Sequence, residues 1–135
     1  MTANLDQIGG KLDEELVGWL TTVTPKGQPK STIVWFLRDG SDLLIYSRPA
    51  KPKLANIAAN PQVAFNLRSD RHGHSIVTME GSATIEDDPI PAHLLPQYVD
   101  KYSESIKANG WTDHSFAEDY SVLIRISVNR LRTRP

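Results

Sequence analysis

Six short segments rich in β-branched and aromatic residues, separated by tight turns, constrain the fold of this chain most strongly. Such side chains fit a pleated, half-buried surface, so each segment predicts a strand. The early turns are too short for the crossovers that parallel neighbours need, which predicts antiparallel pairing. We therefore predict an all-β dominated fold with short helices, a six-stranded antiparallel split β-barrel that leaves few open edges. The predicted strands span residues 19–24, 31–38, 43–47, 62–68, 74–86 and 121–131.

Three helical regions interrupt these strands. Residues 53–60 are rich in alanine, with Pro52 suited to the first turn and Asn60-Pro61 suited to the end. An amphipathic first helix is indicated by apolar residues spaced three and four apart, Leu5, Ile8, Leu12 and Leu16. The third region, residues 90–119, has one apolar face made of Leu94, Leu95, Tyr98, Val99 and Tyr102. Within the strands, Gly81 predicts a bulge or bend.

Composition limits the classes of function. The 135 residues suit a single domain, residues 1–135, with 39% hydrophobic residues and a net charge of -1. That charge provides no general attraction for nucleic acid or an anionic membrane, so neither partner is expected. The chain has no cysteine, which excludes disulfides, thiolate nucleophiles and iron–sulfur clusters. Because no apolar run could span a bilayer and residues 1–11 do not resemble a secretory signal, we expect a cytoplasmic protein.

A cluster of cations lies where a helix begins. Arg48, Lys51 and Lys53 fall within six residues, at a strand end and the start of the predicted helix at residues 53–60. A helix N-terminus carries partial positive charge and free N–H donors, so cations there are unfavourable by a few tenths of a kcal/mol each when exposed. A phosphate or carboxylate ligand would reverse that sign. The cluster is a candidate anion site, although solvated loop cations are also common.

Other side chains leave alternatives open. His72 and His74 have an i, i+2 spacing, but no third ligand stands at a recognisable distance, and we predict no metal site. No hydrolase motif is present. An aromatic set could stack on a planar ring or fill the barrel, namely Trp35, Phe36 and Tyr46. The arginines of the last strand could pair with carboxylates or complete a cofactor pocket; they are Arg125, Arg130, Arg132 and Arg134.

Several short motifs follow one another in a characteristic order. They are LTTVTPKGQP at 20–29, IVWF at 33–36, LLIYS at 43–47, KPKLANI at 51–57, Asn60-Pro61 and EGSA at 80–83. This order resembles the pyridoxamine 5′-phosphate oxidase-like family of flavin and deazaflavin split barrels. The resemblance covers residues 16–132 and is closest to the branch of small enzymes that use the deazaflavin coenzyme F420. The sequence differs from flavin-using relatives at 130–135, where no tryptophan occurs, and from true pyridoxamine phosphate oxidases in lacking a longer C-terminal segment. Both differences favour the deazaflavin branch.

The resemblance implies a homodimer with cofactor sites at the subunit interface. Lys51 and Lys53 would hold the cofactor phosphate, with Ser47, Arg48 and Asn56 beside them. The ring and ribityl side would be lined by residues 30–34, including Lys30, Ser31, Thr32 and Val34. The strand flanking the ring would supply residues 74–78, including His74, Ser75 and Ile76, and the last strand would supply Arg130 or Arg132.

The implied activity is hydride transfer from C5 of reduced F420 to a conjugated, electrophilic small molecule. The catalytic residues are unknown, since water, Lys30 or a tyrosine could each donate the proton. One alternative is an FMN-dependent reductase or oxidase on the same fold. Another is a non-catalytic protein that stores or carries the cofactor or binds single-stranded nucleic acid, the latter disfavoured by the near-neutral charge.

Overall fold

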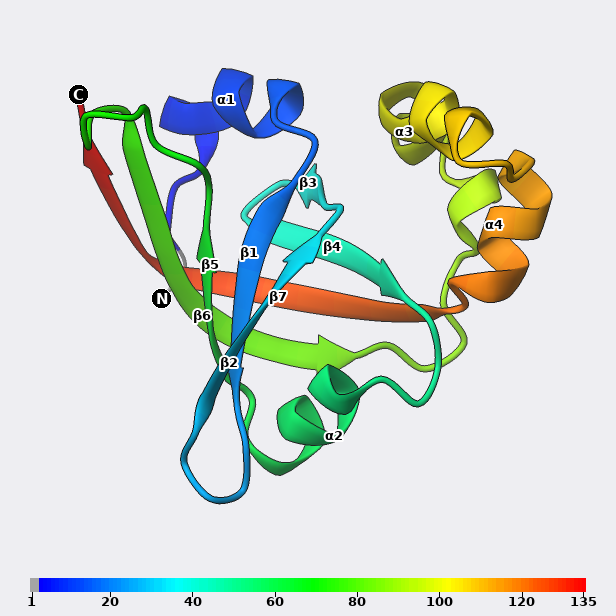
Figure 1. The fold of residues 1–135 in the computed structure, drawn as a ribbon, viewed down its shortest axis with the longest axis horizontal. Helices are drawn as coiled ribbons and strands as arrows, with labels where there is room; N and C mark the ends of the chain where they lie inside the picture. The colour runs from blue at the N-terminus through cyan, green and yellow to red at the C-terminus, as the bar shows by residue number, and fades with distance from the viewer. Residues whose placement is uncertain (1–2) are drawn as a thin grey trace.

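Short helices interrupt a series of strands in the computed structural model, which describes residues 3–135 (Figure 1). The strands are β1 (Gly18–Val23), β2 (Pro29–Val34), β3 (Leu37–Asp39), β4 (Asp42–Ser47), β5 (Gln62–Asn66), β6 (Ile76–Ile85) and β7 (Val122–Arg134). The α-helices are α1 (Gly9–Glu14), α2 (Pro52–Ala59), α3 (Pro96–Ala108) and α4 (Asp113–Asp119). Two 3₁₀ turns complete the regular structure, η1 (Asp6–Ile8) and η2 (Ala92–Leu94).

All strand pairs are antiparallel and form one curled sheet in the order β2-β1-β5-β6-β7-β4-β3. The long strands β6 and β7 bend across the molecule (Figure 1), and their register shifts between Glu80 and Gly81. A Cβ atom at Gly81 would lie 2.4 Å from the Ser127 carbonyl oxygen, so only glycine allows this approach. The predicted bulge is therefore confirmed, and the sheet is the antiparallel half-barrel of a split barrel.

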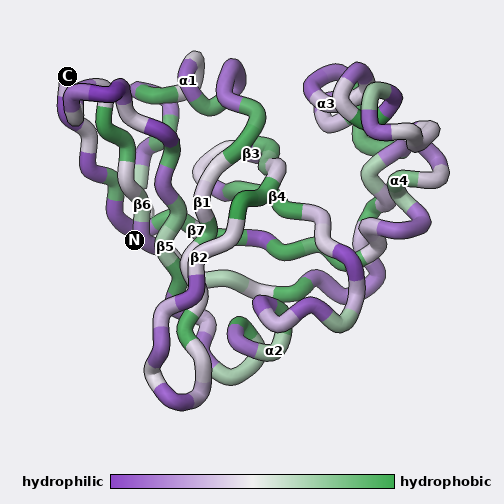
Figure 2. Tube along the Cα trace, in the orientation of Figure 1, coloured by the Kyte–Doolittle hydropathy of each residue, from purple (hydrophilic) through white to green (hydrophobic). Residues whose placement is uncertain are grey.

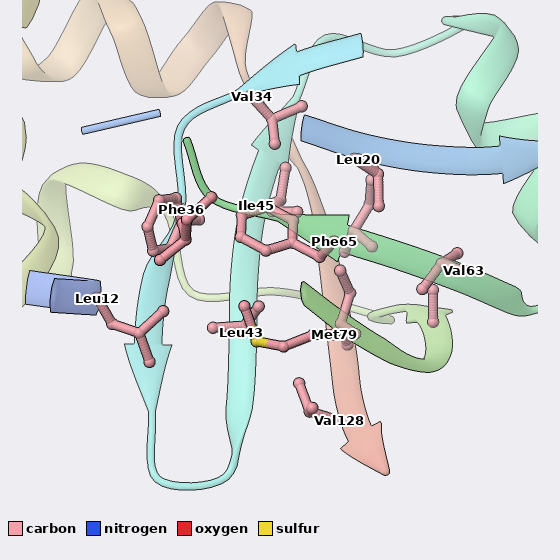
Figure 3. Packing of buried hydrophobic residues seen from close by; sticks show 14 of the residues in the cluster. Leu12, Leu20, Val34, Phe36, Leu43, Ile45, Val63, Phe65, Met79 and Val128 are labelled. Carbon is pink, nitrogen blue, oxygen red and sulfur yellow. The ribbon is translucent and has the colours of Figure 1, made fainter. Parts of the chain in front are cut away.

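The concave side of the sheet holds the barrel core. Phe36 and Phe65 meet edge to face with ring centroids 5.0 Å apart, and Leu20, Ile45 and Met79 surround them (Figure 3). Leu12 of α1 closes one end (Figure 3). The alternation predicted for the last strand is confirmed, since its inward side chains are fully buried, namely Ile124, Ile126 and Val128. Val122 is only half-buried.

The structure has seven strands rather than six because the predicted strand 31–38 is interrupted at Trp35 and Phe36. The Phe36 N–H donates to the Tyr102 hydroxyl at 2.9 Å, and its carbonyl accepts from Tyr102 Oη and Lys101 Nζ, each at 2.9 Å. These side chains from α3 form the hydrogen bonds that a neighbouring strand would otherwise make with the backbone of Phe36. The chain therefore leaves β2, turns and begins β3 separately.

A second apolar core lies under α3 and α4, on the opposite face of β3, β4 and β7. Tyr46, Tyr98 and Phe116 belong to it, and the two helices stand to one side of the sheet in Figure 1. The apolar face predicted for residues 94–102 is correct for Tyr98 and Tyr102. It is wrong for Leu94, which lies in η2 and is 62% exposed. No helix among residues 3–135 has the length and apolar character that crossing a membrane would require.

Two of the wrong boundaries concern the first helix and the strand predicted from residue 74. The first amphipathic segment is a 3₁₀ turn followed by the short helix α1, and it ends before Leu16, which is 45% exposed. The strand predicted from residue 74 begins at Ile76. His74 and Ser75 precede it in a loop, because the His74 N–H donates to Asp70 Oδ1 and Ser75 has φ of 58°. Hydrogen bonds to local side chains compete with the sheet at such positions.

We predict that Tyr102→Phe destabilises the fold. Removing this hydroxyl leaves the buried Phe36 N–H without its partner, which costs about 1–3 kcal/mol. Urea unfolding should show this loss as a lower midpoint with an unchanged slope. Tyr120→Phe is the matched control, because no hydrogen bond of the Tyr120 hydroxyl occurs within residues 3–135, and an equal loss in both variants would refute the explanation.

Candidate functional site

The cation cluster of the sequence lies in the loop between β4 and α2. Lys51 is the residue that precedes the first turn of α2, Pro52 and Lys53 lie in that turn, and no side chain caps the helix and no acidic residue lies in its first turn. Ala50 has φ of 62°, a left-handed conformation that is uncommon outside glycine. Such backbone strain is typical of functional loops. The arrangement is that of a helix N-terminus surrounded by positive charge.

Positive charge in this loop has no ion-pair partner in the part of the chain that the structure describes. Among the described residues, Lys30, Arg48, Lys51 and Lys53 form no ion pair. Burial lowers the pKa of Lys53, and the neighbouring charge of Lys51 lowers it further. A partly buried Lys53 that the exposed Lys51 repels is unfavourable for the protein alone. An anionic group between them would remove this cost.

A cleft of about 370 Å³ lies between the β1–β2 hairpin and the start of α2. We call it the hydroxyl cleft, and its lining residues are Thr22, Thr24, Lys30, Ser31, Thr32, Lys51, Pro52, Lys53 and Asn56. Asn56 is buried, and its side-chain amide donates to Thr22 Oγ1 at 3.1 Å. Thr21 and Ser31 share a hydrogen bond of 2.8 Å between their hydroxyls across the β1–β2 hairpin. The cleft thus combines two lysines at a helix start with several hydroxyl groups.

A second cavity of about 420 Å³ shares Lys51 and Lys53 with the hydroxyl cleft. We call it the aromatic pocket, and it is lined by Ile33, Val34, Trp35, Tyr46, Arg48, Lys51, Lys53, Tyr98, Asn109, Trp111, Phe116 and Tyr120. The Arg48 guanidinium carbon lies 5.1 Å from the centroid of the Tyr120 ring and 5.9 Å from that of Trp111. Trp35 and Phe116 stack with centroids 5.4 Å apart. Aromatic walls and a cationic opening therefore meet in one cavity.

The structure brings together eight of the residues predicted from the sequence. Six of them line the hydroxyl cleft, namely Lys30, Ser31, Thr32, Lys51, Lys53 and Asn56, and the aromatic pocket adds Val34 and Arg48. Trp35 and Tyr46 line the aromatic pocket, as expected for side chains that could stack on a planar ring, whereas Phe36 fills the barrel. Ser47 lines neither cavity, because it is buried and its hydroxyl donates to the Arg48 carbonyl at 2.8 Å.

The remaining predicted residues lie elsewhere in the same chain. Ser75 and Ile76 border a shallow hollow near the C-terminus, where Lys11 Nζ donates to the Ser75 carbonyl at 2.6 Å. His74 is exposed beside Asp70, with Nδ1 3.6 Å from the carboxylate. Arg130 lines a separate depression on β5, β6 and β7. This end of β6 and β7 lies on the opposite side of the molecule from α2 (Figure 1).

Several lining residues were missed by the sequence reasoning. Thr22 and Thr24 alternate along β1 and its turn, and their inward direction follows only from the hairpin register. Trp111, Phe116 and Tyr120 approach β4 because α4 folds back after a capping box at Thr112 and Ser115. The aromatic spacing within 111–120 was a usable signal. Within residues 3–135, no group of three or more His, Cys, Asp or Glu side chains could hold a metal ion.

The sequence left open whether Arg125 pairs with carboxylates or completes a cofactor pocket, and the structure shows that it pairs with carboxylates. Its guanidinium pairs with Glu86 at 2.5 Å and with Asp39 and Asp42 at 3.0 Å each, and these contacts raise its pKa, the hydrogen bond to Glu86 most of all. Arg132 lies 3.8 Å from Glu80. These ion pairs of Arg125 therefore link β7 to the β3–β4 turn and to the end of β6.

Comparison with known proteins agrees with this architecture. The family model for pyridoxamine 5′-phosphate oxidase matches residues 5–134, and the chain belongs to this family. A candidate pyridoxamine 5′-phosphate oxidase from Listeria innocua is 26% identical, with a TM-score of 0.68 and 94% of each chain covered. No curated protein sequence matches significantly.

Two further solved structures share the fold. An F420 reductase is 24% identical, with a TM-score of 0.67, over 90% of this chain and 92% of its own. The heme storage protein HutZ from Vibrio cholerae is 16% identical, with a TM-score of 0.66, over 98% of this chain and 96% of its own. The fold therefore occurs in both a reductase and a storage protein.

We predict that Lys53→Met stabilises the unliganded protein near neutral pH. The folded pKa of Lys53 lies below the unfolded value of 10.5, so the unfolded chain binds more protons between those two values. The wild-type free energy of unfolding should therefore increase as pH rises between these two pKa values. The stability advantage of Lys53→Met over wild type should decrease over the same pH range. Urea unfolding at several pH values measures this, with the exposed Lys26→Met as the control. A gap between Lys53→Met and wild type that stays constant with pH would contradict the desolvation argument.

Proposed function

We propose that this protein is an oxidoreductase that binds the deazaflavin coenzyme F420 and transfers a hydride from it to a conjugated, electrophilic small molecule. Membership of the pyridoxamine 5′-phosphate oxidase family and the fold shared with an F420 reductase support this proposal. The observation that carries it is the pair Lys51 and Lys53. Within residues 3–135 they form no ion pair, they repel each other, and they lie at a helix start that no side chain caps.

The residues present fit a phosphate-bearing coenzyme. In the hydroxyl cleft, Lys51 and Lys53 would hold the phosphate, and the α2 N-terminus adds its partial positive charge. Lys30, Ser31 and Thr32 would bind the polyhydroxyl chain, because they offer donors and acceptors along one strand. Asn56 is held against Thr22 and supports the wall of the cleft.

When bound, the deazaflavin supplies the hydride, and the protein supplies position and charge. The two lysines neutralise the phosphate and fix the coenzyme in one orientation, which lowers the entropic part of the barrier. The aromatic side chains next to the cleft exclude water from the reacting face. The proton would come from water, from Lys30 or from a tyrosine.

FMN is the alternative coenzyme, since it carries the same phosphate and a similar ring. A non-catalytic role in storing or carrying the cofactor is the alternative function. The heme storage protein, which shares this fold, supports that alternative. Tight coenzyme binding without turnover on any conjugated electrophile would support the carrier role. A yellow protein with a flavin spectrum would support FMN.

We also propose a homodimer, for two reasons. The outward face of the β1–β2 hairpin exposes Trp19 and Ile33, 45% and 52% accessible, directly opposite each other in the pairing of the strands. An apolar pair at that exposure on a sheet edge is favourable when a second copy covers it. His74, Ser75, Ile76 and Arg130 are distant from the cleft of their own chain, so in a dimer they would serve the site of the partner.

The cofactor assignment predicts that Lys51→Ala/Lys53→Ala weakens F420 binding at least about tenfold, because two charge-assisted contacts to phosphate are lost. Titrating the wild-type protein and the double variant with F420 and with FMN by fluorescence measures this. Lys26→Ala/Lys107→Ala removes the same charge at exposed positions and should leave affinity unchanged. Equal affinity in the first double variant and the wild type would show that the phosphate is not bound here.

The dimer assignment predicts that Trp19→Glu shifts the protein to monomer, because it places a charge in an apolar contact. Light scattering on a sizing column gives the mass, which is 15.1 kDa for one chain. Lys26→Glu is the control and should leave the dimer intact, because Lys26 is exposed in the turn between β1 and β2. The tip of this hairpin is hydrophilic (Figure 2). A wild-type protein that elutes as a monomer would refute the proposal.

A further inference from the structure

Two histidines that are far apart in the sequence meet in the structure. His93 lies in η2 and His114 in α4, and their ring centroids are 4.9 Å apart with the ring planes inclined by 74°. Packing does not explain this pair, because the His114 side chain is 68% exposed. The second core fixes both supporting elements, since Ala92 of η2 and Phe116 of α4 are buried in it. The two imidazoles are therefore held near each other by well-packed backbone.

Glu118 lies one helical turn after His114 on α4, and its Oε1 is 2.8 Å from His114 Nδ1. At this distance the Nδ1–H of the neutral ring donates to the carboxylate, which leaves the lone pair of the ring on Nε2. A carboxylate placed behind a histidine in this way is the common partner of a metal-ligating imidazole, because it fixes the tautomer and the orientation of the ring. His114 therefore has the arrangement of a metal ligand.

The ring of His93 is not used by the rest of the protein. Its Nδ1 has no hydrogen-bond partner within residues 3–135. The side chain as a whole is partly exposed, so the ring can be reached from solvent. A neutral imidazole carries one nitrogen lone pair, and here no described residue donates a hydrogen bond to it. That lone pair is available to a partner from outside the chain.

The separation of the two rings matches that of two ligands on one ion. Imidazoles that share a tetrahedral ion have ring centroids about 5 Å apart, because each ligating nitrogen lies roughly 2.0–2.1 Å from the ion. His93 and His114 already have this separation, 4.9 Å. Binding an ion between them would therefore require rotation of the rings and not a movement of η2 relative to α4.

From this geometry we infer that His93 and His114 together bind a divalent transition-metal ion such as Zn²⁺, with Glu118 as the positioning residue behind His114. Imidazole nitrogen is a ligand that suits zinc, copper and nickel. No group of three or more His, Cys, Asp or Glu side chains in the described part of the chain could hold a metal ion, so water completes the coordination. The three residues line neither the hydroxyl cleft nor the aromatic pocket, so this site is separate from the proposed coenzyme site.

Zinc titration of the full chain tests the inference. The chain has four histidines and no cysteine, so the competing imidazole pair is His72 with His74. Calorimetry with zinc chloride at up to about 100 µM free ion should show one ion bound per wild-type chain. His93→Gln and His114→Gln should each weaken binding at least about tenfold, because each removes one of the two protein ligands. The control His72→Gln/His74→Gln should bind zinc as the wild type does.

Glu118→Ala tests the positioning role. Removing a carboxylate behind a ligating histidine typically weakens metal binding about 10- to 100-fold, and we expect the lower figure because Glu118 is 67% exposed. Glu118→Gln keeps an oxygen acceptor and should recover part of the affinity. Glu14→Ala removes the same charge from an exposed position on α1, away from α4 (Figure 1), and should leave zinc binding unchanged. Equal affinity in Glu118→Ala and wild type would refute the role of Glu118.

Urea unfolding separates loss of a ligand from loss of the fold. Without zinc, His114→Gln should unfold near the wild-type midpoint, because its side chain is exposed. An ion that binds only the native state raises the midpoint, so zinc should stabilise the wild type and the His72→Gln/His74→Gln control but not His114→Gln. A wild-type protein that binds no zinc would overturn the inference. Binding that is lost in the control, or kept in both His93→Gln and His114→Gln, would overturn it as well.

Discussion

The hydrogen bonds between Tyr102 and the backbone of Phe36 tie the helical layer to the barrel. The Tyr102 hydroxyl is fully buried, accepts from the Phe36 N–H and also contacts the Leu16 carbonyl at 2.7 Å. Lys101 adds a contact to Leu12 at 2.9 Å, and burial lowers its pKa to about 8. Satisfying the backbone at this break lets Phe36 enter the barrel while Trp35 faces the helices. The position of α3, and with it Tyr98, follows from this junction.

The two cavities differ in chemistry because they are built from different layers. Paired strands and a helix start supply hydroxyls and lysines to the hydroxyl cleft, whereas the helical segment between β6 and β7 supplies rings to the aromatic pocket. Lys51 and Lys53 belong to both. An anionic group bound at these lysines would therefore lie where the two cavities meet.

Stability and binding oppose each other in this region. Three features are each unfavourable for the isolated chain: a partly buried Lys53 repelled by Lys51, a left-handed Ala50, and a buried Tyr98 hydroxyl that has no hydrogen-bond partner within residues 3–135. The rest of the protein offsets them with two apolar cores and the Arg125 cluster, which joins carboxylates of the β3–β4 turn and of the residue after β6. Destabilising features that cluster around cavities in this way are characteristic of a binding site.

The sequence by itself determined the fold class, the antiparallel hairpins, the Gly81 bulge and the cation cluster, because each depends on residue types within a few positions. The tertiary structure determined the features that depend on contacts between segments far apart in the sequence. It split residues 31–38 into two strands through Tyr102, moved His74 and Ser75 out of β6, and brought α4 to Arg48. Side-chain contacts across 66 residues of sequence leave no local pattern, so no periodicity or spacing could have revealed them.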